Sequence, residues 1–439
     1  MKLTLTAIVA FLFTLSASAQ QLDTASLDRL FDSIAVHNQS MASVLLTHKG
    51  KKVYERAIGY AVVDSAHSVK ATPDTRYRIG SITKTFTATM IMQLAEENKL
   101  TLDTRLDKYF PAIPNAGQIT IEMMLRHRSG IYNFTDEDAY WKSNTQPRTR
   151  AEMLAIFEKH TPAFTPDAQS TYSNTNYVLL GYMIEDITGK SYEKNLQERI
   201  LSRAGLKNTR FGGKIEPTKG EAYSYSFGKR WEKHKESDLS QPAAAGAIVS
   251  TPRDVTAFME ALFEGKLVSQ KSLGEMTRIV DVFGIGLMPI AFDEKNGFGH
   301  TGGIDGFRSL TVYFPGDSLV AAVFSNGADY SLNDMLIAML RTHYKLPVTI
   351  PDFRAMQLSP EDLERYAGEY VSQQIPVRMT ISHSNNRLYG KPGDQPAFRL
   401  MPVKKNVFKY DAADLTMEFR PDAKELTITQ DGQALLFTK

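Results

Sequence analysis

Residues 77–100 read YRIGSITKTFTATMIMQLAEENKL and predict a helix that begins at Ser81. Apolar residues recur there every three or four positions, at Phe86, Met90 and Leu94. That spacing is typical of a helix that buries one face. The segment therefore sets a helix at the centre of the chain, with a serine at its start.

The same helix start carries a lysine three positions after the serine, in the pattern Ser81-x-x-Lys84. Residues three apart share a helix face, so the amine can reach the hydroxyl. A serine needs a base to take its proton, and a lysine can do so only if its pKa falls through burial or nearby positive charge. The pattern recurs at Ser191 and Ser226, but Ser191 follows Gly189 as a helix N-cap and Ser226 is expected in a polar loop. Ser81 is therefore the candidate nucleophile.

A second motif, Tyr172-Ser173-Asn174, is the only Y-x-N in the chain and precedes a helix expected over 174–188. A phenol can relay protons if a neighbouring lysine charge lowers its pKa. An asparagine amide can bind both a lysine and a substrate amide. The alternative is that Asn174 caps the helix and Tyr172 packs in the core.

A third motif, His300-Thr301-Gly302-Gly303, precedes the strand-forming run SLTVYF. Glycine in a strand lets another backbone approach closely. The N–H groups of Gly303 and Ser81 could form an oxyanion hole, in which one donor is worth about 3–4 kcal/mol of barrier. The alternative is a glycine-rich bend with a surface histidine.

The order of elements predicts an α+β fold. Residues 42–60 read as a hairpin and residues 309–326 as two strands around a Pro-Gly-Asp turn. Helices lie between them, including one that starts at Thr251-Pro252, an N-cap followed by proline. Strands, then helices, then strands indicate an antiparallel β-sheet flanked by helices.

The two ends of the chain differ from this middle part. Residues 1–19 have a lysine, a short apolar run and Ala-Ser-Ala, which predicts a signal peptide and a mature protein that begins at Gln20. The apolar run is too short for a transmembrane anchor. We expect a main domain over 20–347 and a small all-β, barrel-like domain over 358–439. The location implied is periplasmic or secreted.

The composition of the chain argues against several kinds of functional site. The 439 residues carry a formal charge of +2, too neutral for a protein that mainly binds nucleic acid. No cysteine is present, which excludes disulfides, thiolate nucleophiles and cysteine metal sites. The nine histidines contain no HExxH, which gives a histidine-based metal site little support. We expect an enzyme that uses no metal and no cofactor. The expected partner is a small-molecule or peptide substrate, and the sequence leaves the oligomeric state open.

The three motifs, in this order, resemble those of the serine β-lactamase and penicillin-binding-protein superfamily. The tyrosine of the second motif is similar to the class C β-lactamase branch. Further segments also read like family blocks: MMLRHRSGIYNF, TYSNTNYVLLGYMIEDITGKSYE, AAAGAIVSTPRDVTAFM and FGHTGGIDGFRSL. The resemblance covers about residues 25–345, and the C-terminal unit resembles a small lipocalin-like barrel.

The resemblance implies a role for each site residue. Ser81 would be the acylated nucleophile, Lys84 its base or the modulator of that base, and Tyr172 the proton shuttle. Asn174 would orient the lysine and the substrate amide. The substrate would face His300, Thr301, Gly302 and Gly303. Which of Lys84 and Tyr172 takes the first proton stays open. His127-Arg128-Ser129-Gly130 is expected to be mostly architectural.

His300 stands where many β-lactamases have lysine. Histidine is mostly neutral above about pH 6.5 and gives no permanent charge for a carboxylate. In this superfamily His-Thr-Gly occurs in peptidase and esterase branches, so we expect a D-amino-acid peptidase or an esterase. The alternatives are a true β-lactamase or a penicillin-binding sensor that does not turn over. The loops around 133–150 and 213–245, which would shape the pocket, indicate no particular substrate.

Overall fold

The computed structural model describes residues 24–65, 67–227, 230–351, 353, 358–384, 387–393, 395, 397–410, 413, 415–430 and 432–439. The expected signal peptide lies outside these residues. Within the described part of the chain, no helix combines the length and the apolar character needed to cross a membrane.

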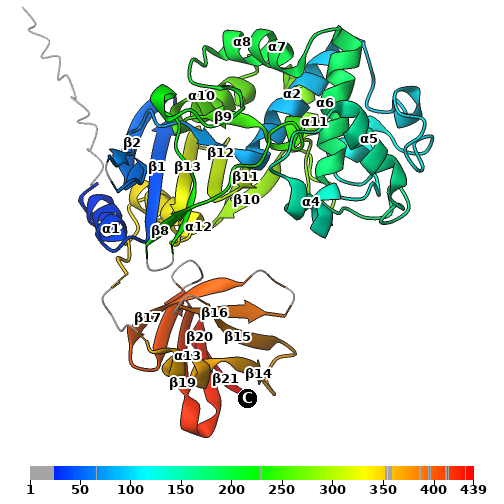
Figure 1. The fold of residues 1–439 in the computed structure, drawn as a ribbon. Coiled ribbons are helices and arrows are strands. Elements are labelled where there is room, and N and C mark those ends of the chain that lie inside the picture. Colours follow the sequence, from blue (N-terminus) through cyan, green and yellow to red (C-terminus); the bar gives the residue numbers. More distant parts are fainter. Residues whose placement is uncertain are drawn as a thin grey trace, which may run out of the picture.

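A six-stranded antiparallel sheet is the centre of the first part of the chain (Figure 1). Its strands follow the spatial order β10 (Met288–Phe292), β11 (Lys295–Ile304), β12 (Phe307–Phe314), β13 (Leu319–Ala328), β1 (Ser40–His48) and β2 (Lys51–Ile58). Both predicted hairpins, β1–β2 and β12–β13, are confirmed. Strand β13 pairs along all of β1, so the first and last strands of this part lie side by side.

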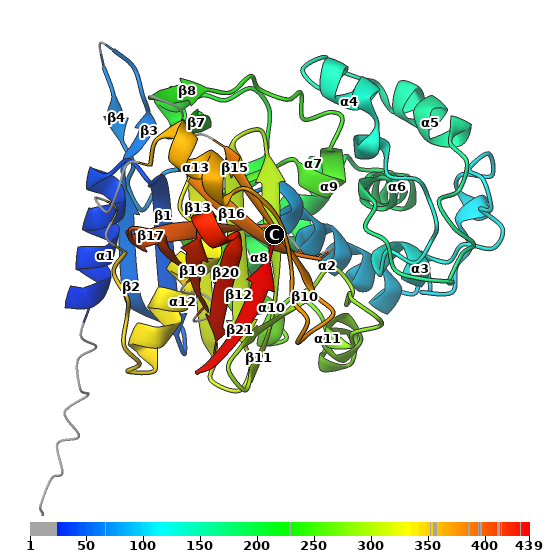
Figure 2. The same cartoon turned by 90° about the horizontal axis from the view of Figure 1, so that it is seen from below.

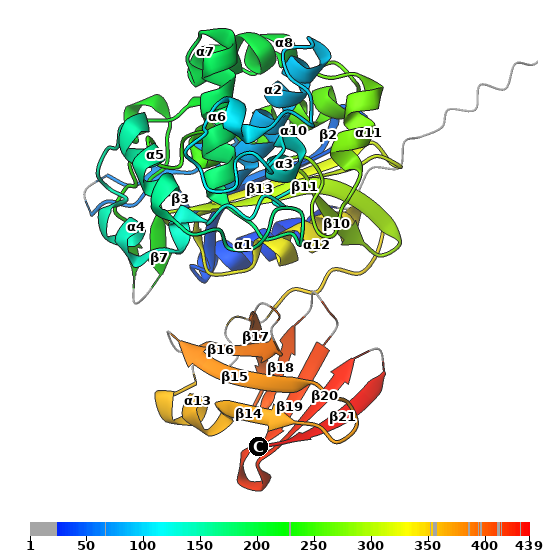
Figure 3. The same ribbon diagram turned by 90° about the vertical axis from the view of Figure 1, so that its right-hand side faces the viewer.

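Helices cover both faces of the sheet, as Figure 3 shows. Helices α1 (Ala25–Val36) and α12 (Leu332–His343) pack on one face, and α10 (Pro252–Phe263) packs on the other. Strand β13 contributes to both cores: Ala321 and Val323 lie toward α12, whereas Val320, Ala322 and Phe324 lie toward α10. This is the period of two that a strand buried on both sides requires. The predicted α+β class is confirmed.

Helix α2 (Thr83–Glu96) follows a short 3-10 turn, η1 (Gly80–Ile82). Ser81 therefore lies in this turn and not in the α-helix itself. The expectation of a single buried face is wrong, since every residue from Thr83 to Leu94 is buried. The threonines that look polar in the sequence bind backbone carbonyls; for example, Thr85 donates to Gly286 O at 2.8 Å. Satisfied hydroxyls make it possible to bury the whole helix.

Two other predicted helices are confirmed. Helix α6 (Asn174–Thr188) ends at Gly189 with φ +66°, and α10 begins after Thr251, whose hydroxyl accepts from the N–H of Asp254 at 3.2 Å. The remaining helices of this part are α3 (Ile121–Leu125), α4 (Asp138–Ser143), α5 (Arg150–Lys159), α7 (Tyr192–Leu196), α8 (Ser202–Ala204), α9 (Ala243–Gly246) and α11 (Gln270–Thr277).

Short strands complete the first part. They are β3 (Tyr60–Val62), β4 (Val69–Lys70), β5 (Tyr77–Arg78), β6 (Arg210–Phe211), β7 (Tyr225–Phe227), β8 (Trp231–Lys233) and β9 (Ile248–Ser250).

The two other S-x-x-K serines lie away from helix α2. Ser191 caps α7 as predicted, since it accepts from the N–H of Lys194 at 3.2 Å. Ser226 lies on strand β7, so its placement in a polar loop is wrong.

The C-terminal part is a closed eight-stranded barrel (Figure 2). Helix α13 (Pro360–Tyr366) leads into β14 (Gly368–Val371), β15 (Arg378–Ser384), β16 (Arg387–Pro392), β17 (Phe398–Lys404), β18 (Val407–Tyr410), β19 (Leu415–Arg420), β20 (Glu425–Gln430) and β21 (Gln433–Thr438). The barrel has its own apolar core, which includes Leu363, Phe408 and Met417. The expected barrel-like unit is confirmed.

One acidic residue links the barrel to the first part of the chain. Asp329, at the end of β13, forms ion pairs with Arg387 and Arg399 of the barrel. Arg399 also donates to Oε1 of Gln39 at 2.8 Å. These side chains are largely buried, with 10% of Asp329 and 16% of Arg399 exposed. The contact is therefore a desolvated ion pair rather than a surface one.

Candidate active site

The first and third motifs meet where turn η1 lies against strand β11. A side chain on Gly302 would come within 2.1 Å of the carbonyl oxygen of Ile79, so only glycine fits at this position. Ser309, on the neighbouring strand β12, donates to the same carbonyl at 2.8 Å. Burial alternates along β11, so that Thr301 and Gly303 are exposed beside Ser81 while Gly302 is buried. The exposed edge is where a ligand can lie.

Lys84 joins the first motif to the second. Its Nζ lies 2.9 Å from Oγ of Ser81, 2.8 Å from Oδ1 of Asn174 and 2.7 Å from the carbonyl oxygen of Ala245. The side chain is completely buried. Burial holds the pKa of Lys84 well below its ordinary value of 10.5, because a charged amine is disfavoured away from water. The expected fall in the lysine pKa is confirmed.

These three contacts determine where a neutral amine directs its lone pair. The carbonyl oxygens of Asn174 and Ala245 can only accept hydrogen bonds. A neutral amine has two N–H donors, and these two oxygens take both. The remaining lone pair then faces the hydroxyl of Ser81, which donates to it. The arrangement suits Lys84 as the base that receives the serine proton.

The amide of Asn174 is held by two further residues. Its Nδ2 donates to Oγ1 of Thr135 at 3.0 Å and to Oδ1 of Asn133 at 3.3 Å. This orientation leaves Oδ1 facing Lys84. The alternative interpretation of Asn174 as a helix cap is wrong, because the N-cap of α6 is Ser173.

The Tyr172 side chain lies beside the Ser81 hydroxyl, and its ring centroid lies 4.8 Å from Nζ of Lys84. Burial raises the pKa of Tyr172 above its ordinary value of 10.0, and the nearby Ser81 hydroxyl opposes this only in part. The condition named for a phenolate relay, a pKa lowered by lysine charge, is therefore not met in this structure. Burial favours the neutral form of Lys84, so little positive charge is available to stabilise a phenolate.

His127 positions the segment that carries Tyr172. Its ring stacks on the Tyr172 ring with 4.4 Å between centroids, and its Nδ1 accepts from the N–H of Ser173 at 3.1 Å. Its carbonyl accepts from the N–H of Thr171 at 2.9 Å. Its backbone has φ +57°, a left-handed conformation. The contacts agree with the architectural role that the sequence suggests.

His300 is buried rather than on the surface, with 3% of its area exposed. Its Nδ1 lies 2.6 Å from the carbonyl oxygen of Thr301, and this acceptor requires the proton to be on Nδ1. Burial lowers the pKa of His300 to about 4. The imidazole is therefore neutral at neutral pH.

Sequence reasoning did not find three of the contacts to this site. The carbonyl of Ala245 leaves no trace in the side-chain pattern, and Asn133 and Thr135 lie in a loop without a motif. Among the described residues, no group of three histidine or acidic side chains is placed to hold a metal ion.

Comparison with known proteins places this geometry in a family. A family model described as Beta-lactamase matches residues 27–342. The chain belongs to the β-lactamase family. Penicillin-binding protein 4* of Bacillus subtilis (strain 168) is 24% identical over 92% of this chain and 96% of its own length. The family includes serine hydrolases, and this chain is one at that level of description.

Two solved structures of similar proteins extend the comparison. D-amino acid amidase from Ochrobactrum anthropi SV3 has a TM-score of 0.65 and 27% identity, and covers 73% of this chain and 99% of its own. The octameric penicillin-binding protein homologue from Pyrococcus abyssi has a TM-score of 0.67 at 21% identity, and covers 94% of this chain and 99% of its own. At that identity the second likeness concerns the fold alone.

Proposed function

We propose that this β-lactamase-family protein hydrolyses amides or esters of D-amino acids through an acyl-enzyme on Ser81. The observation that carries the proposal is the 2.9 Å contact between Oγ of Ser81 and Nζ of the fully buried Lys84. A buried, neutral amine at hydrogen-bond distance is the base that a serine nucleophile needs.

In the acylation step, Oγ of Ser81 attacks the substrate carbonyl carbon while its proton passes to Nζ of Lys84. The carbonyl oxygen becomes an oxyanion, for which the N–H groups of Ser81 and Gly303 are the proposed donors. The carbon–nitrogen or carbon–oxygen bond then breaks. The leaving group takes a proton from Tyr172, whose raised pKa keeps the phenol protonated at neutral pH. The proton that Lys84 received then passes to the Tyr172 phenolate, so both groups return to their starting protonation states while Ser81 carries the acyl group.

Deacylation uses the same groups in reverse. A water molecule attacks the ester carbon, gives one proton to the Tyr172–Lys84 pair, and releases the acid with Ser81 restored. Because Tyr172 and Lys84 share Ser81 as a partner, their protons titrate as a unit.

The preference for amides and esters rests on His300. A β-lactam carries a carboxylate that benefits from a permanent cation, and a neutral imidazole with a pKa of about 4 does not supply one. The likeness to D-amino acid amidase, at 27% identity, favours the same substrate class. The runner-up activities are a β-lactamase and a penicillin-binding sensor without turnover.

We also propose that the protein is exported to the periplasm or secreted. The lysine, the apolar run and Ala-Ser-Ala in residues 1–19 support export. N-terminal sequencing of the protein recovered outside the cytoplasm should begin at Gln20. An intact Met1 on protein that remains in the cytoplasm would contradict this.

The catalytic proposal is tested by labelling and by turnover. A fluorophosphonate probe should add one mass increment to the wild-type protein at Ser81 and none to Ser81→Ala, with Ser191→Ala as the matched control that still reacts. D-alanyl peptides, D-phenylalanine amide, p-nitrophenyl esters and a chromogenic cephalosporin are then compared side by side. A cephalosporin rate far above the others would establish the β-lactamase instead. A stable adduct without product would establish the sensor.

A further inference from the structure

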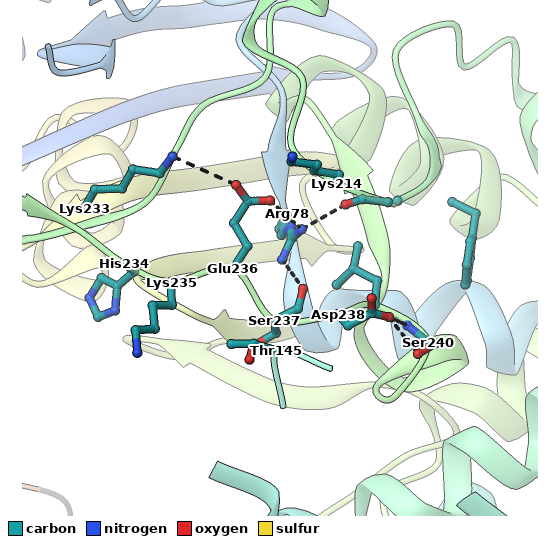
Figure 4. A pocket seen from close by; sticks show the side chains of 14 residues that line it. Arg78, Thr145, Lys214, Lys233, His234, Lys235, Glu236, Ser237, Asp238 and Ser240 are labelled. Carbon is teal, nitrogen blue, oxygen red and sulfur yellow. Dashed lines mark hydrogen bonds and ion pairs between the residues drawn. The ribbon is translucent and has the colours of Figure 1, made fainter. Parts of the chain in front are cut away.

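A cavity of about 670 Å³ lies between strand β5, the loop after β6 and the segment after β8. Its basic side chains are Arg78, Lys214, Lys233 and Lys235, and its carboxylates are Glu236 and Asp238 (Figure 4). We call it the lysine-rich cavity. Thr145 and residues 213, 214 and 233–240 come from the two loops that the sequence predicted to shape a pocket.

Hydrogen bonds link the walls of the lysine-rich cavity to the end of strand β11, which carries the third motif. Arg78 lies three residues before Ser81, and its guanidinium donates to Oδ2 of Asp305 at 2.9 Å. Asp305 follows Gly303 by two residues. The wall formed by 237–240 leads into helix α9, where the carbonyl of Ala245 binds Lys84. Ser237 of the same wall donates to Oδ1 of Asp305, which directly follows β11, so the cavity adjoins the end of this strand.

The cavity lies at the opposite end of this strand from His300. Ile304, the last residue of β11, lies four positions after His300, which is about 13 Å of extended chain. The ring of Tyr172 lies on the His300 side, with 6.3 Å between the ring centroids. In the proposed reaction Tyr172 protonates the leaving group, so the leaving group lies toward His300. The acyl part of the substrate then extends past Gly303 toward the lysine-rich cavity.

The charge of the cavity is not balanced within the protein. Arg78 pairs with Asp305 at 2.9 Å, and Glu236 lies 3.6 Å from Arg78 and 4.0 Å from Lys233, so two carboxylates face these two cations. Asp238 is occupied by Ser240, whose hydroxyl donates to it at 2.7 Å. Within the described part of the chain, Lys214 and Lys235 form no ion pair.

A buried polar atom points to the same conclusion. The Arg78 side chain is only 2% exposed, and it donates to Gly213 O and Ser237 O besides Asp305. Its Nε is buried and has no hydrogen-bond partner among the described residues. A buried donor without a partner is uncommon, and a ligand acceptor in the cavity would satisfy it.

We propose that the lysine-rich cavity binds a carboxylate on the acyl side of the substrate, attracted by the exposed side chains of Lys214 and Lys235. This deepens the proposed function and rests on it. The distance from Gly303 to Asp305 is about 7 Å of extended chain, so the carboxylate should lie about 7–10 Å from the scissile carbonyl. Acyl groups with a terminal carboxylate at that reach are the preferred class.

The kinetic test uses two p-nitroanilides that differ in one group. N-succinyl-D-alanine p-nitroanilide carries the carboxylate, and N-succinamoyl-D-alanine p-nitroanilide carries a neutral amide in its place. We expect kcat/KM to favour the succinyl substrate by about tenfold or more, as one charged hydrogen-bonded contact provides. The preference should reside mainly in KM and should shrink when salt rises from about 50 mM to about 500 mM.

The double variant Lys214→Gln/Lys235→Gln should bring the succinyl-to-succinamoyl ratio toward one. The matched control, Lys51→Gln/Lys391→Gln, removes the same charge from exposed lysines on β2 and β16 and should keep the wild-type ratio. An unchanged ratio in the Lys214/Lys235 variant would overturn the cavity proposal even if hydrolysis through Ser81 is intact.

A binding experiment separates this proposal from the proposed function. Titration calorimetry on Ser81→Ala compares N-succinyl-D-alanine with N-succinamoyl-D-alanine, independently of turnover. Tighter binding of the succinyl compound, lost when Lys214→Gln/Lys235→Gln is added, supports the cavity proposal whether or not the wild type is active. Equal binding of the two compounds overturns it, whereas failure of Ser81 labelling overturns only the proposed function.

Discussion

The ring of His127 stacks on the ring of Tyr172 with 4.4 Å between their centroids. The same imidazole accepts the N–H of Ser173, so one side chain fixes both the ring and the backbone of the second motif. A proton donor works only when it is placed correctly, and a displacement of about 1 Å can cost about 10²-fold in rate. His127 is thus a positioning residue for Tyr172.

Two substitutions of His127 should separate the effect of losing the imidazole ring from the effect of its left-handed backbone conformation. His127→Ala leaves the N–H of Ser173 without an acceptor and places alanine at φ +57°, so we expect it to lose about 2 kcal/mol of unfolding free energy. His127→Asn tolerates this φ and offers a carbonyl, and should be more stable than the alanine variant. Both should lower kcat more than KM rises. Urea unfolding and steady-state kinetics check this, and equal stability of the two variants would contradict it.

Lys84→Met should slow modification of Ser81 by a fluorophosphonate by about 10³-fold, because general base catalysis typically contributes 10²–10⁴-fold. Lys194→Met is the matched control, since Lys194 stands in the same S-x-x-K pattern after Ser191 but pairs with Glu198 at the surface. The measurement is the rate of mass increase under pre-steady-state conditions. An equal loss of labelling rate in both variants would contradict the prediction, because the effect would then not depend on the position of Lys84 beside Ser81.

Stability should fall below neutral pH in part because of His300. Its pKa is about 4 in the folded protein and about 6.5 when unfolded, so the unfolded state binds a proton that the folded state does not between these values. The free energy of unfolding should therefore decrease as pH falls from about 6.5 toward 4. His300 contributes about 2 kcal/mol of this loss between pH 7 and pH 5. His300→Gln should show a correspondingly smaller decrease in urea titrations at the two pH values, and an identical decrease would refute the assignment.

Gly302→Ala should destabilise the protein severely, because the added Cβ would lie 2.1 Å from the Ile79 carbonyl and 2.3 Å from Oγ of Ser309. Gly274→Ala is the control: nothing lies within 4 Å of its Cβ, and it lies in helix α11. There alanine should add about 0.5–1 kcal/mol. Thermal unfolding of the two variants should therefore shift in opposite directions.

Asp329→Ala should weaken the contact between the barrel and the rest of the chain. It would leave Arg387 and Arg399 largely buried without their partner, which costs about 3 kcal/mol or more. Asp422→Ala removes the partner of Arg365 from a pair in which Asp422 is 96% exposed, and should change stability by less than about 1 kcal/mol. Similar unfolding midpoints for both variants would mean that the Asp329 contact adds nothing to stability.

The sequence predicted those features that depend on local spacing. Ser81 and Lys84 are three residues apart, and Gly189 and Thr251 mark helix ends by their own chemistry, so each could be read from the chain directly. The strand pairs around Lys49-Gly50 and Pro315-Gly316 were readable for the same reason.

Features that depend on burial were not readable. The direction of the Tyr172 pKa shift could not be derived, because the sequence shows the neighbouring lysine but not that both side chains are buried away from water. The threonines of α2 look polar in the sequence, so the helix was not recognised as buried on every side. In the structure the hydroxyls of Thr85 and Thr87 donate to backbone carbonyls of distant segments.

The pairing of β1 with β13 has a consequence for how the chain is made. His48 pairs with Leu319, so the strand that is synthesised early finds its neighbour only after most of the polypeptide has left the ribosome. At translation speeds of roughly 5–20 residues per second, β1 remains without its partner strand β13 for tens of seconds. Such a long-range closure is slow in itself, because much of the intervening polypeptide must be ordered first. The catalytic site around Ser81 is therefore completed late in synthesis, only after β13 has been made.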